Sequence, residues 1–136
     1  MKIVLRLLAI AVVCSAVPLS AHHGTGISYD ASAPPHVLKG VVTEFAWRNP
    51  HVSIFMDVKD ADGKVTNWGI ELSNVASLAK EGYHRNTLKP GMEITAYVTR
   101  SKSGAPVGLV EKVVLADGKE VLQRDRPGQG RRREQN

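Results

Sequence analysis

Residues 52–72 read VSIFMDVKDADGKVTNWGIEL, with apolar and polar side chains alternating on both sides of Ala61-Asp62-Gly63. Such alternation is typical of β-strands that bury one face. A three-residue loop with glycine in the left-handed position commonly joins two antiparallel strands. A shift of one residue would set polar against apolar side chains along the whole pair, so the pattern predicts one register. The pairs expected on the apolar face are Val58 with Thr66, Met56 with Trp68, Ile54 with Ile70 and Val52 with Leu72.

Three further strands are expected around this hairpin, at residues 37–47, 92–99 and 107–115, with a short extension at 120–122. In the first strand we place Val41, Thr43, Phe45 and Trp47 on one side, and Gly40 permits a sharp bend or a close approach.

A short helix should follow Ser73-Asn74 and end at Gly82, because asparagine caps helix starts and glycine helix ends. Its expected apolar positions are Val75, Leu78 and Ala79.

The order of three strands, a helix and two strands is that of the OB-fold, a five-stranded barrel. Barrel closure removes exposed strand edges. The phrase Leu88-Lys89-Pro90-Gly91-Met92-Glu93-Ile94-Thr95 also resembles the entry to the fourth strand in small OB domains. We therefore predict a mainly β, OB-like barrel with one short helix between strands 3 and 4; an open β-sandwich of the same strands is the alternative.

Residues 1–21 have the pattern of a cleavable signal peptide. Lys2 and Arg6 precede an apolar run at 7–13, and Ala21 is the expected cleavage point. Cys14-Ser15-Ala16 is a competing cleavage site. The apolar run is too short for a transmembrane anchor. We expect export to the periplasm or secretion. Because Cys14 is the only cysteine, the exported chain would gain no disulfide.

The remaining chain divides into an N-terminal arm at 22–36, a β domain at 37–123 and an Arg-rich tail at 124–136 that we expect to be disordered. Region 22–123 carries as many basic as acidic residues. A nucleic-acid-binding domain would show a basic face, so nucleic acid is not an expected partner. The basic tail can contact anionic surfaces, or serve only solubility.

The sequence resembles an uncharacterised family of small exported bacterial proteins, the domain of unknown function family DUF6152. The resemblance rests on His22-His23, Tyr29-Asp30, residues 40–45, Trp47-Arg48-Asn49-Pro50-His51, residues 58–64, Asn67-Trp68, Glu71-Leu72, residues 88–91 and residues 116–118. The Asn-Pro-His and Asn-Trp segments are its most specific parts. It implies export and one small domain, and it implies no activity because the family has none assigned.

Cleavage after Ala21 would make His22 the first residue, and a terminal histidine chelates metal through its amine and its ring together. Together with His23, and with His51 as a further ligand, it predicts a candidate site for copper, since Cu(II) binds most tightly among the divalent first-row ions. The alternative is a polar terminus that binds copper only weakly. Cleavage before Val17 would remove the terminal chelate.

Trp47, Asn49, His51 and Glu71 are the candidate ligand-binding residues. In the predicted register Glu71 lies diagonally across the hairpin from His51, within reach of long side chains. A carboxylate at that place orients an imidazole ring. A purely structural hydrogen bond is the alternative. Trp47 lies by the first loop, a common ligand position in OB-folds, where it would either stack on a ligand or cover the barrel end. Trp68 is expected in the core.

No nucleophile elbow, phosphate loop or metalloprotease helix occurs in the sequence. The expected function is a non-enzymatic periplasmic or secreted binding or accessory module. Its partner is an unidentified envelope protein or a small ligand. The alternative is a periplasmic copper-binding protein, and a copper-dependent redox enzyme is the least favoured reading.

Overall fold

The computed structural model describes residues 28–124. The expected signal peptide at 1–21, the candidate metal ligands His22 and His23, and the tail from residue 125 onward lie outside the described residues. Of the N-terminal arm, residues 28–35 are described, and they lead directly into the first strand.

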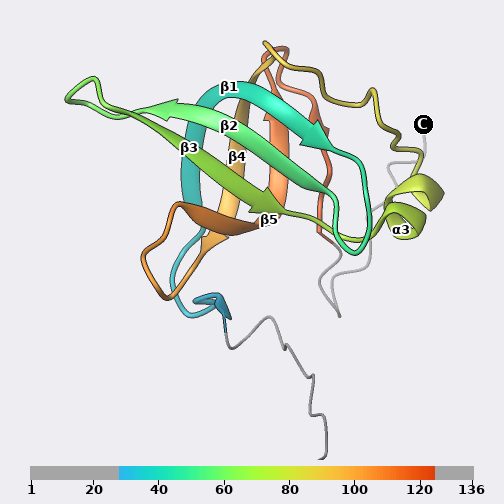
Figure 1. Ribbon diagram of the computed structural model, residues 1–136, viewed down its shortest axis with the longest axis horizontal. Helices are drawn as coiled ribbons and strands as arrows, with labels where there is room; N and C mark the ends of the chain where they lie inside the picture. The colour runs from blue at the N-terminus through green and yellow to red at the C-terminus, as the bar shows by residue number, and fades with distance from the viewer. Residues whose placement is uncertain (1–27, 125–136) are drawn as a thin grey trace, which may run out of the picture.

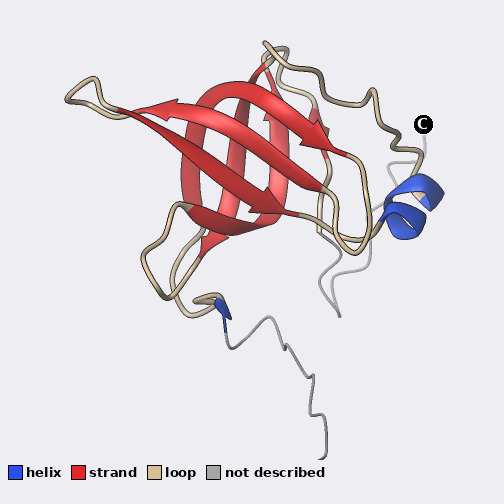
Figure 2. Cartoon of the chain, viewed as in Figure 1, coloured by secondary structure: helices blue, strands red, loops and turns tan. Residues whose placement is uncertain are grey.

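Residues 28–124 fold into a small closed β-barrel, with a short helix between its third and fourth strands (Figure 1, Figure 2). In order, its elements are β1 (His36–Ala46), β2 (Ser53–Lys59), β3 (Val65–Glu71), α3 (Val75–Lys80), β4 (Glu93–Arg100), β5 (Val107–Leu115) and β6 (Glu120–Val121). Their order across the sheet is β3-β2-β1-β4-β5-β6, and a parallel pairing of β3 with β5 closes the ring. The predicted barrel is therefore confirmed, and the open sandwich is not what forms.

The β2–β3 hairpin has the register that its alternation predicts. Met56 pairs with Trp68, Ile54 with Ile70 and Phe55 with Gly69. Asp60 N donates to Lys64 O at 2.9 Å, and Gly63 takes a φ of 85°, as a three-residue loop requires. Side chains of Ile54, Met56 and Ile70 are fully buried, so the matched apolar faces line the barrel interior.

The side chains of β1 do not point to the sides predicted from the sequence. We expected Val41, Thr43, Phe45 and Trp47 on one side, but Val41 is exposed and the buried residues of the strand's first half are Leu38 and Val42. The pairing of β1 with β2 shifts between Val42 and Glu44, which leaves Thr43 as a β-bulge. A bulge adds one residue and exchanges the two faces of the strand beyond it. Phe45 and Trp47 accordingly pack against the core.

The helix begins as predicted and covers one end of the barrel (Figure 2). Asn74 Oδ1 accepts the backbone N–H of Ser77 at 2.9 Å, and Gly82 has a φ of 89°. Leu78 is buried beneath the helix, whereas Ala79, expected on the apolar face, is exposed because a helix of less than two turns offers the core few positions.

Candidate functional site

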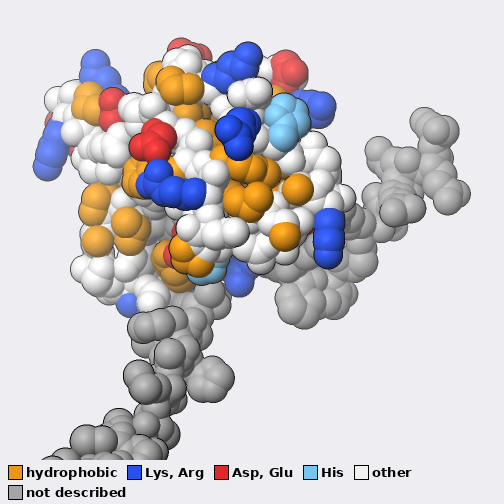
Figure 3. Space-filling view, turned by 45° about the vertical axis from the view of Figure 1, so that its right-hand side comes forward, with side chains coloured by type: hydrophobic (Ala, Val, Ile, Leu, Met, Phe, Trp, Pro, Cys, Tyr) orange, Lys and Arg blue, Asp and Glu red, His pale blue; other side chains and the backbone are white. Residues whose placement is uncertain are grey.

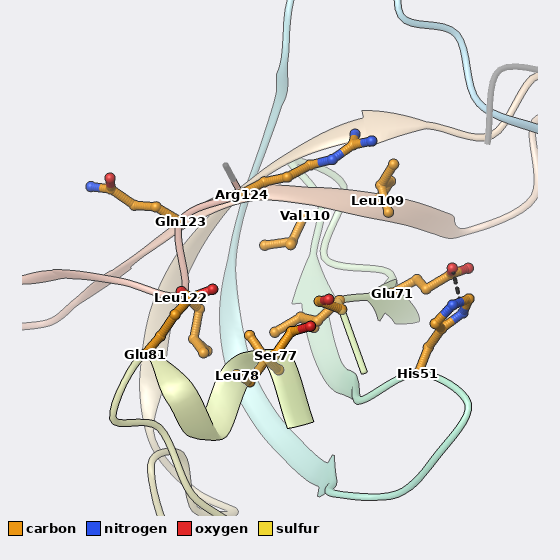
Figure 4. Close-up of a pocket in the computed structure, with 12 residues that line it drawn as sticks. His51, Glu71, Ser77, Leu78, Glu81, Leu109, Val110, Leu122, Gln123 and Arg124 are labelled. Carbon is orange, nitrogen blue, oxygen red and sulfur yellow. Dashed lines mark ion pairs between the residues drawn. The ribbon is translucent and has the colours of Figure 1, made fainter. Parts of the chain in front are cut away.

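His51 and Glu71 meet where β2 begins and β3 ends. His51 Nδ1 lies 2.7 Å from Glu71 Oε1 (Figure 4). The loop that carries His51 contains a cis peptide bond between Asn49 and Pro50. The neighbouring pair Ser53 and Glu71 is in register across the hairpin, so the diagonal placement inferred from the sequence brings the imidazole and the carboxylate together.

Tyr29, in the N-terminal arm, completes the cluster. Its hydroxyl donates to Glu71 Oε2 at 2.9 Å. The arm is held at this place by an isolated bridge between Tyr29 and Ser101 and by a bond from Asp30 N to Arg100 O at 2.9 Å. Burial, the hydrogen bond to Glu71 and the negative charge of Glu71 raise the pKa of Tyr29 to about 12.

The hydrogen bonds define which atoms of the cluster remain available. Glu71 accepts from both neighbours, so the ring of His51 carries its proton on Nδ1, and in the neutral ring Nε2 keeps a lone pair. Half of the His51 side chain is exposed (51%), and no other described residue bonds to its Nε2. The cluster thus presents an outward acceptor on a ring of fixed orientation.

Two hollows meet at this cluster, and His51 and Glu71 line both. We call the first the end cavity; it has a volume of about 360 Å³ and lies between β3, α3, β5 and the segment after β6 (Figure 4). Leu72, Leu78, Val110 and Leu122 form its apolar part, and Ser77, Glu81 and Arg124 lie on its polar side.

The second hollow, which we call the outer groove, has a volume of about 350 Å³ and lies on the outer side of β2 and β3. It is lined by Tyr29, Pro50, His51, Ser53, Phe55, Gly69, Ile70, Glu71 and Val107. These residues come from the β1–β2 loop, from β2 and β3, and from the start of β5 just after the β4–β5 loop. In OB-folds, the β2–β3 face flanked by these two loops is the usual ligand position.

Trp47 and Asn49, two of the candidate ligand-binding residues, line neither the end cavity nor the outer groove. Trp47 is half-buried with its ring 5.7 Å from that of Phe45. Asn49 Oδ1 accepts the backbone N–H of Val75 at 3.3 Å, which ties the β1–β2 loop to the start of α3. Both residues therefore hold the loop that carries His51.

Trp68 lies in the core, 8% exposed, as predicted. The ring of His36 is 5.6 Å away and the Arg100 guanidinium 5.8 Å away. Burial and the charge of Arg100 lower the pKa of His36, so this histidine favours its neutral form.

Metal ligands do not cluster within residues 28–124: no group of three or more His, Cys, Asp or Glu side chains there is placed to hold an ion. His84, in the same part of the chain, accepts the backbone N–H of Asn86 through Nδ1 at 3.2 Å, and it is exposed. Within those residues, His51 is the histidine that a carboxylate orients.

Tyr29 is the site residue that sequence reasoning did not identify. The arm around it is rich in Gly, Ser, Ala and Pro and has no periodicity, and its partner Glu71 is 42 positions away. The one signal was that Tyr29-Asp30 belongs to the segments that carry the family resemblance.

Comparison with known proteins gives one family. A model described as a family of unknown function (DUF6152) matches residues 9–112, and the chain belongs to that family. The matched segment contains Tyr29, His51 and Glu71. Neither the curated proteins nor the solved structures contain a match. Among residues 28–124, no helix has the length and apolar character needed to cross a bilayer.

Proposed function

We propose that this member of the DUF6152 family is a non-enzymatic binding or accessory module, exported to the periplasm or secreted, that holds a small ligand at the Tyr29–Glu71–His51 cluster. Export is supported by the leader pattern at residues 1–21. Mass measurement of the N-terminus of the native protein tests it. A mature chain that begins at His22 or Val17 is expected, and an uncleaved Met1 would contradict export by this route.

The observation that carries the proposal is the double engagement of Glu71. Its two oxygens accept bonds from His51 at 2.7 Å and from Tyr29 at 2.9 Å, and these partners come from the β1–β2 loop and from the N-terminal arm. Ligand sites are hollows with a few polar groups of fixed orientation, usually of 300–1,000 Å³. The cluster provides such groups at the edge of two hollows of about 360 and 350 Å³.

The charge distribution also favours a small ligand over a polyanion. On the face displayed in Figure 3, Lys and Arg side chains are interspersed with Asp and Glu side chains, and hydrophobic side chains lie between them. A nucleic-acid interface would gather Lys and Arg into a patch or stripe.

Nuclear magnetic resonance with the isotope-labelled, processed chain tests the proposal. The probes are glucose, disodium phosphate, tetramethylammonium chloride, butyrate and glycine. At least one probe is expected to shift the backbone amides of His51 and Glu71. His51→Ala should abolish that shift and the matched control His84→Ala should retain it. If no probe shifts these amides, or if His51→Ala leaves the response unchanged, the proposal is wrong.

A periplasmic copper-binding protein is the second candidate, with His22, His23 and His51 as ligands. What favours it is the bond from His51 Nδ1 to Glu71, because histidines that bind metal through one ring nitrogen usually donate the other N–H to a carboxylate or carbonyl. Only residues 24–28 separate His23 from Tyr29, and an extended chain spans about 3.3–3.6 Å per residue, so the length permits His23 to reach the cluster.

Calorimetric titration with Cu(II) distinguishes the two candidates. A copper protein should bind one equivalent, and binding should weaken when the terminal amine is acetylated and again in His51→Ala. Equal, weak binding by the acetylated chain and the native chain would rule this candidate out.

A further inference from the structure

The outer groove has a charge and hydrogen-bonding character that restricts its ligand. Of its lining residues, Glu71 is the one acid, His51 is the one histidine, and none is Lys or Arg. Phosphates and carboxylates are bound in proteins by cationic or multiple N–H donors, which this lining does not contribute from its side chains. An anionic ligand therefore has little to bind there.

The polar atoms at the groove are mainly acceptors. Each oxygen of Glu71 already accepts one hydrogen bond and retains capacity for another, and His51 Nε2 has a lone pair in the neutral ring. The Tyr29 hydroxyl donates its hydrogen bond to Glu71, so its oxygen can act towards a ligand only as an acceptor. A ligand that satisfies three neighbouring acceptors must itself carry several donors on one side.

Beside these acceptors lies an apolar platform made by Phe55, Gly69 and Val107. Gly69 has no side chain, and a Cβ there would lie 3.4 Å from Phe55 Cε1 and 3.6 Å from Val107 Cγ1. The Phe55 ring and the exposed Val107 thus border a strip of bare backbone. The face of an aromatic ring is electronegative and attracts C–H bonds that neighbouring oxygens have polarised.

We propose that the outer groove binds a short neutral saccharide, with a C–H face of one sugar ring on Phe55 and Val107 and with hydroxyl groups donating to Glu71, His51 and Tyr29. A sugar ring is uncharged, carries several hydroxyl donors on its rim and has an apolar face, which are the three properties the groove requires. The volume of about 350 Å³ suits a short saccharide. The inference rests on the proposed function and names its ligand class.

Titration of the processed, isotope-labelled chain with N-acetylglucosamine and with cellobiose tests this inference. Either sugar is expected to shift the amides of Ser53, Gly69 and Val107 in a saturable way. Phe55→Leu removes the aromatic face and should weaken binding roughly tenfold, as loss of one good contact does. The matched control Tyr97→Leu changes a half-buried aromatic residue on β4 and should leave the affinity unchanged.

A second variant fills the platform without removing a contact of the fold. The methyl group of Gly69→Ala meets its neighbours at ordinary van der Waals distances, so the chain should fold, and the methyl group should lower the sugar affinity roughly tenfold or more. Unchanged sugar affinity in both Phe55→Leu and Gly69→Ala would overturn the inference.

The remaining outcomes separate this inference from the proposed function. If phosphate or tetramethylammonium gives His51-dependent shifts and neither sugar does, the saccharide is wrong and the binding module stands. If the sugars shift Ser77 and Leu78 of the end cavity in place of the outer groove, the saccharide site is also wrong. If no sugar and no other probe produces a response at the cluster, both proposals fail.

Discussion

Glu71 organises the site at the level of single residues. Its side chain is about two-thirds withdrawn from solvent (29% exposed), and a carboxylate in such a place loses part of its hydration. The donors Tyr29 and His51 replace that hydration and come from the arm and from the β1–β2 loop. One carboxylate therefore fastens two irregular segments to the end of β3, where neither has a regular secondary structure to hold it.

Titration of tyrosines offers a direct test of this arrangement. Burial disfavours the ionised phenol of Tyr29, and Glu71 adds a hydrogen bond to the neutral form and a repelling negative charge, so the pKa rises to about 12 from the ordinary value of 10.0. An absorbance titration of tyrosinate should show one transition near pH 12 that Tyr29→Phe removes. Glu71→Gln should move that transition to lower pH. Identical curves for the native chain and Tyr29→Phe near pH 12 would contradict the bond.

The same shift links stability to pH with a definite sign. The folded state holds the Tyr29 proton more tightly than the unfolded state, so the stabilisation is complete below about pH 10 and is lost as the pH rises through about 12. The native chain should therefore exceed Tyr29→Phe in free energy of unfolding by more at pH 9 than at pH 12, and urea unfolding at the two pH values measures this.

At the level of elements, β1 shows how closely the strands approach one another, because it pairs with β2 on one side and with β4 on the other. Gly40 faces Val58 of β2 and Ile94 of β4, at the place where the strand curves between the two halves of the barrel. A Cβ at Gly40 would lie 2.1 Å from the backbone oxygen of Asp57. Only glycine lets the two backbones approach in this way.

Gly40→Ala should therefore lower the free energy of unfolding by roughly 3 kcal/mol or more, since backbone has to move to admit the methyl group. Gly69→Ala is the control, because its methyl group would meet Phe55 at 3.4 Å; its stability should stay within about 0.5 kcal/mol of the native value. Chemical denaturation of the two variants measures both. Similar losses in the two would show that β1 and β2 do not approach so closely.

The same elements show how far sequence reasoning reaches. In the β2–β3 hairpin, a period of two and a loop of three residues constrain each other, so the register is predictable residue by residue. In β1 the bulge at Thr43 reverses the facing, and nothing in the alternation of that strand marks it.

In the candidate site, too, one part could be predicted from the sequence and another part could not. His51 and Glu71 lie on one hairpin, so their approach follows from its register, whereas Tyr29 arrives through the tertiary placement of the arm. The two hollows depend on the packing of segments far apart in sequence, which no local pattern encodes.

At the level of the whole molecule, the chain closes the barrel end with its own last described segment. Val121 and Leu122 are buried, and Leu122 borders the end cavity. The Tyr83 hydroxyl accepts the backbone N–H of Leu122 at 2.9 Å, and Arg124 N donates to Glu111 O at 2.9 Å. This segment therefore joins β5 to the loop after α3 and completes the core that the strands leave open.

Leu122 carries both a packing role and a backbone role, and two substitutions separate them. It is 1% exposed and has a φ of 52°, a left-handed conformation that costs a non-glycine residue roughly 1–2 kcal/mol. Leu122→Ala should lose about 2–5 kcal/mol of stability through the cavity it creates. Leu122→Gly removes the same side chain but also relieves the strain of the left-handed backbone. This relief offsets the roughly 0.5–1 kcal/mol by which glycine usually makes a protein less stable than alanine does. Urea denaturation should thus find the glycine variant at least as stable as the alanine variant. A glycine variant clearly less stable than the alanine variant would mean that residue 122 is not left-handed and that the segment closes the barrel in another way.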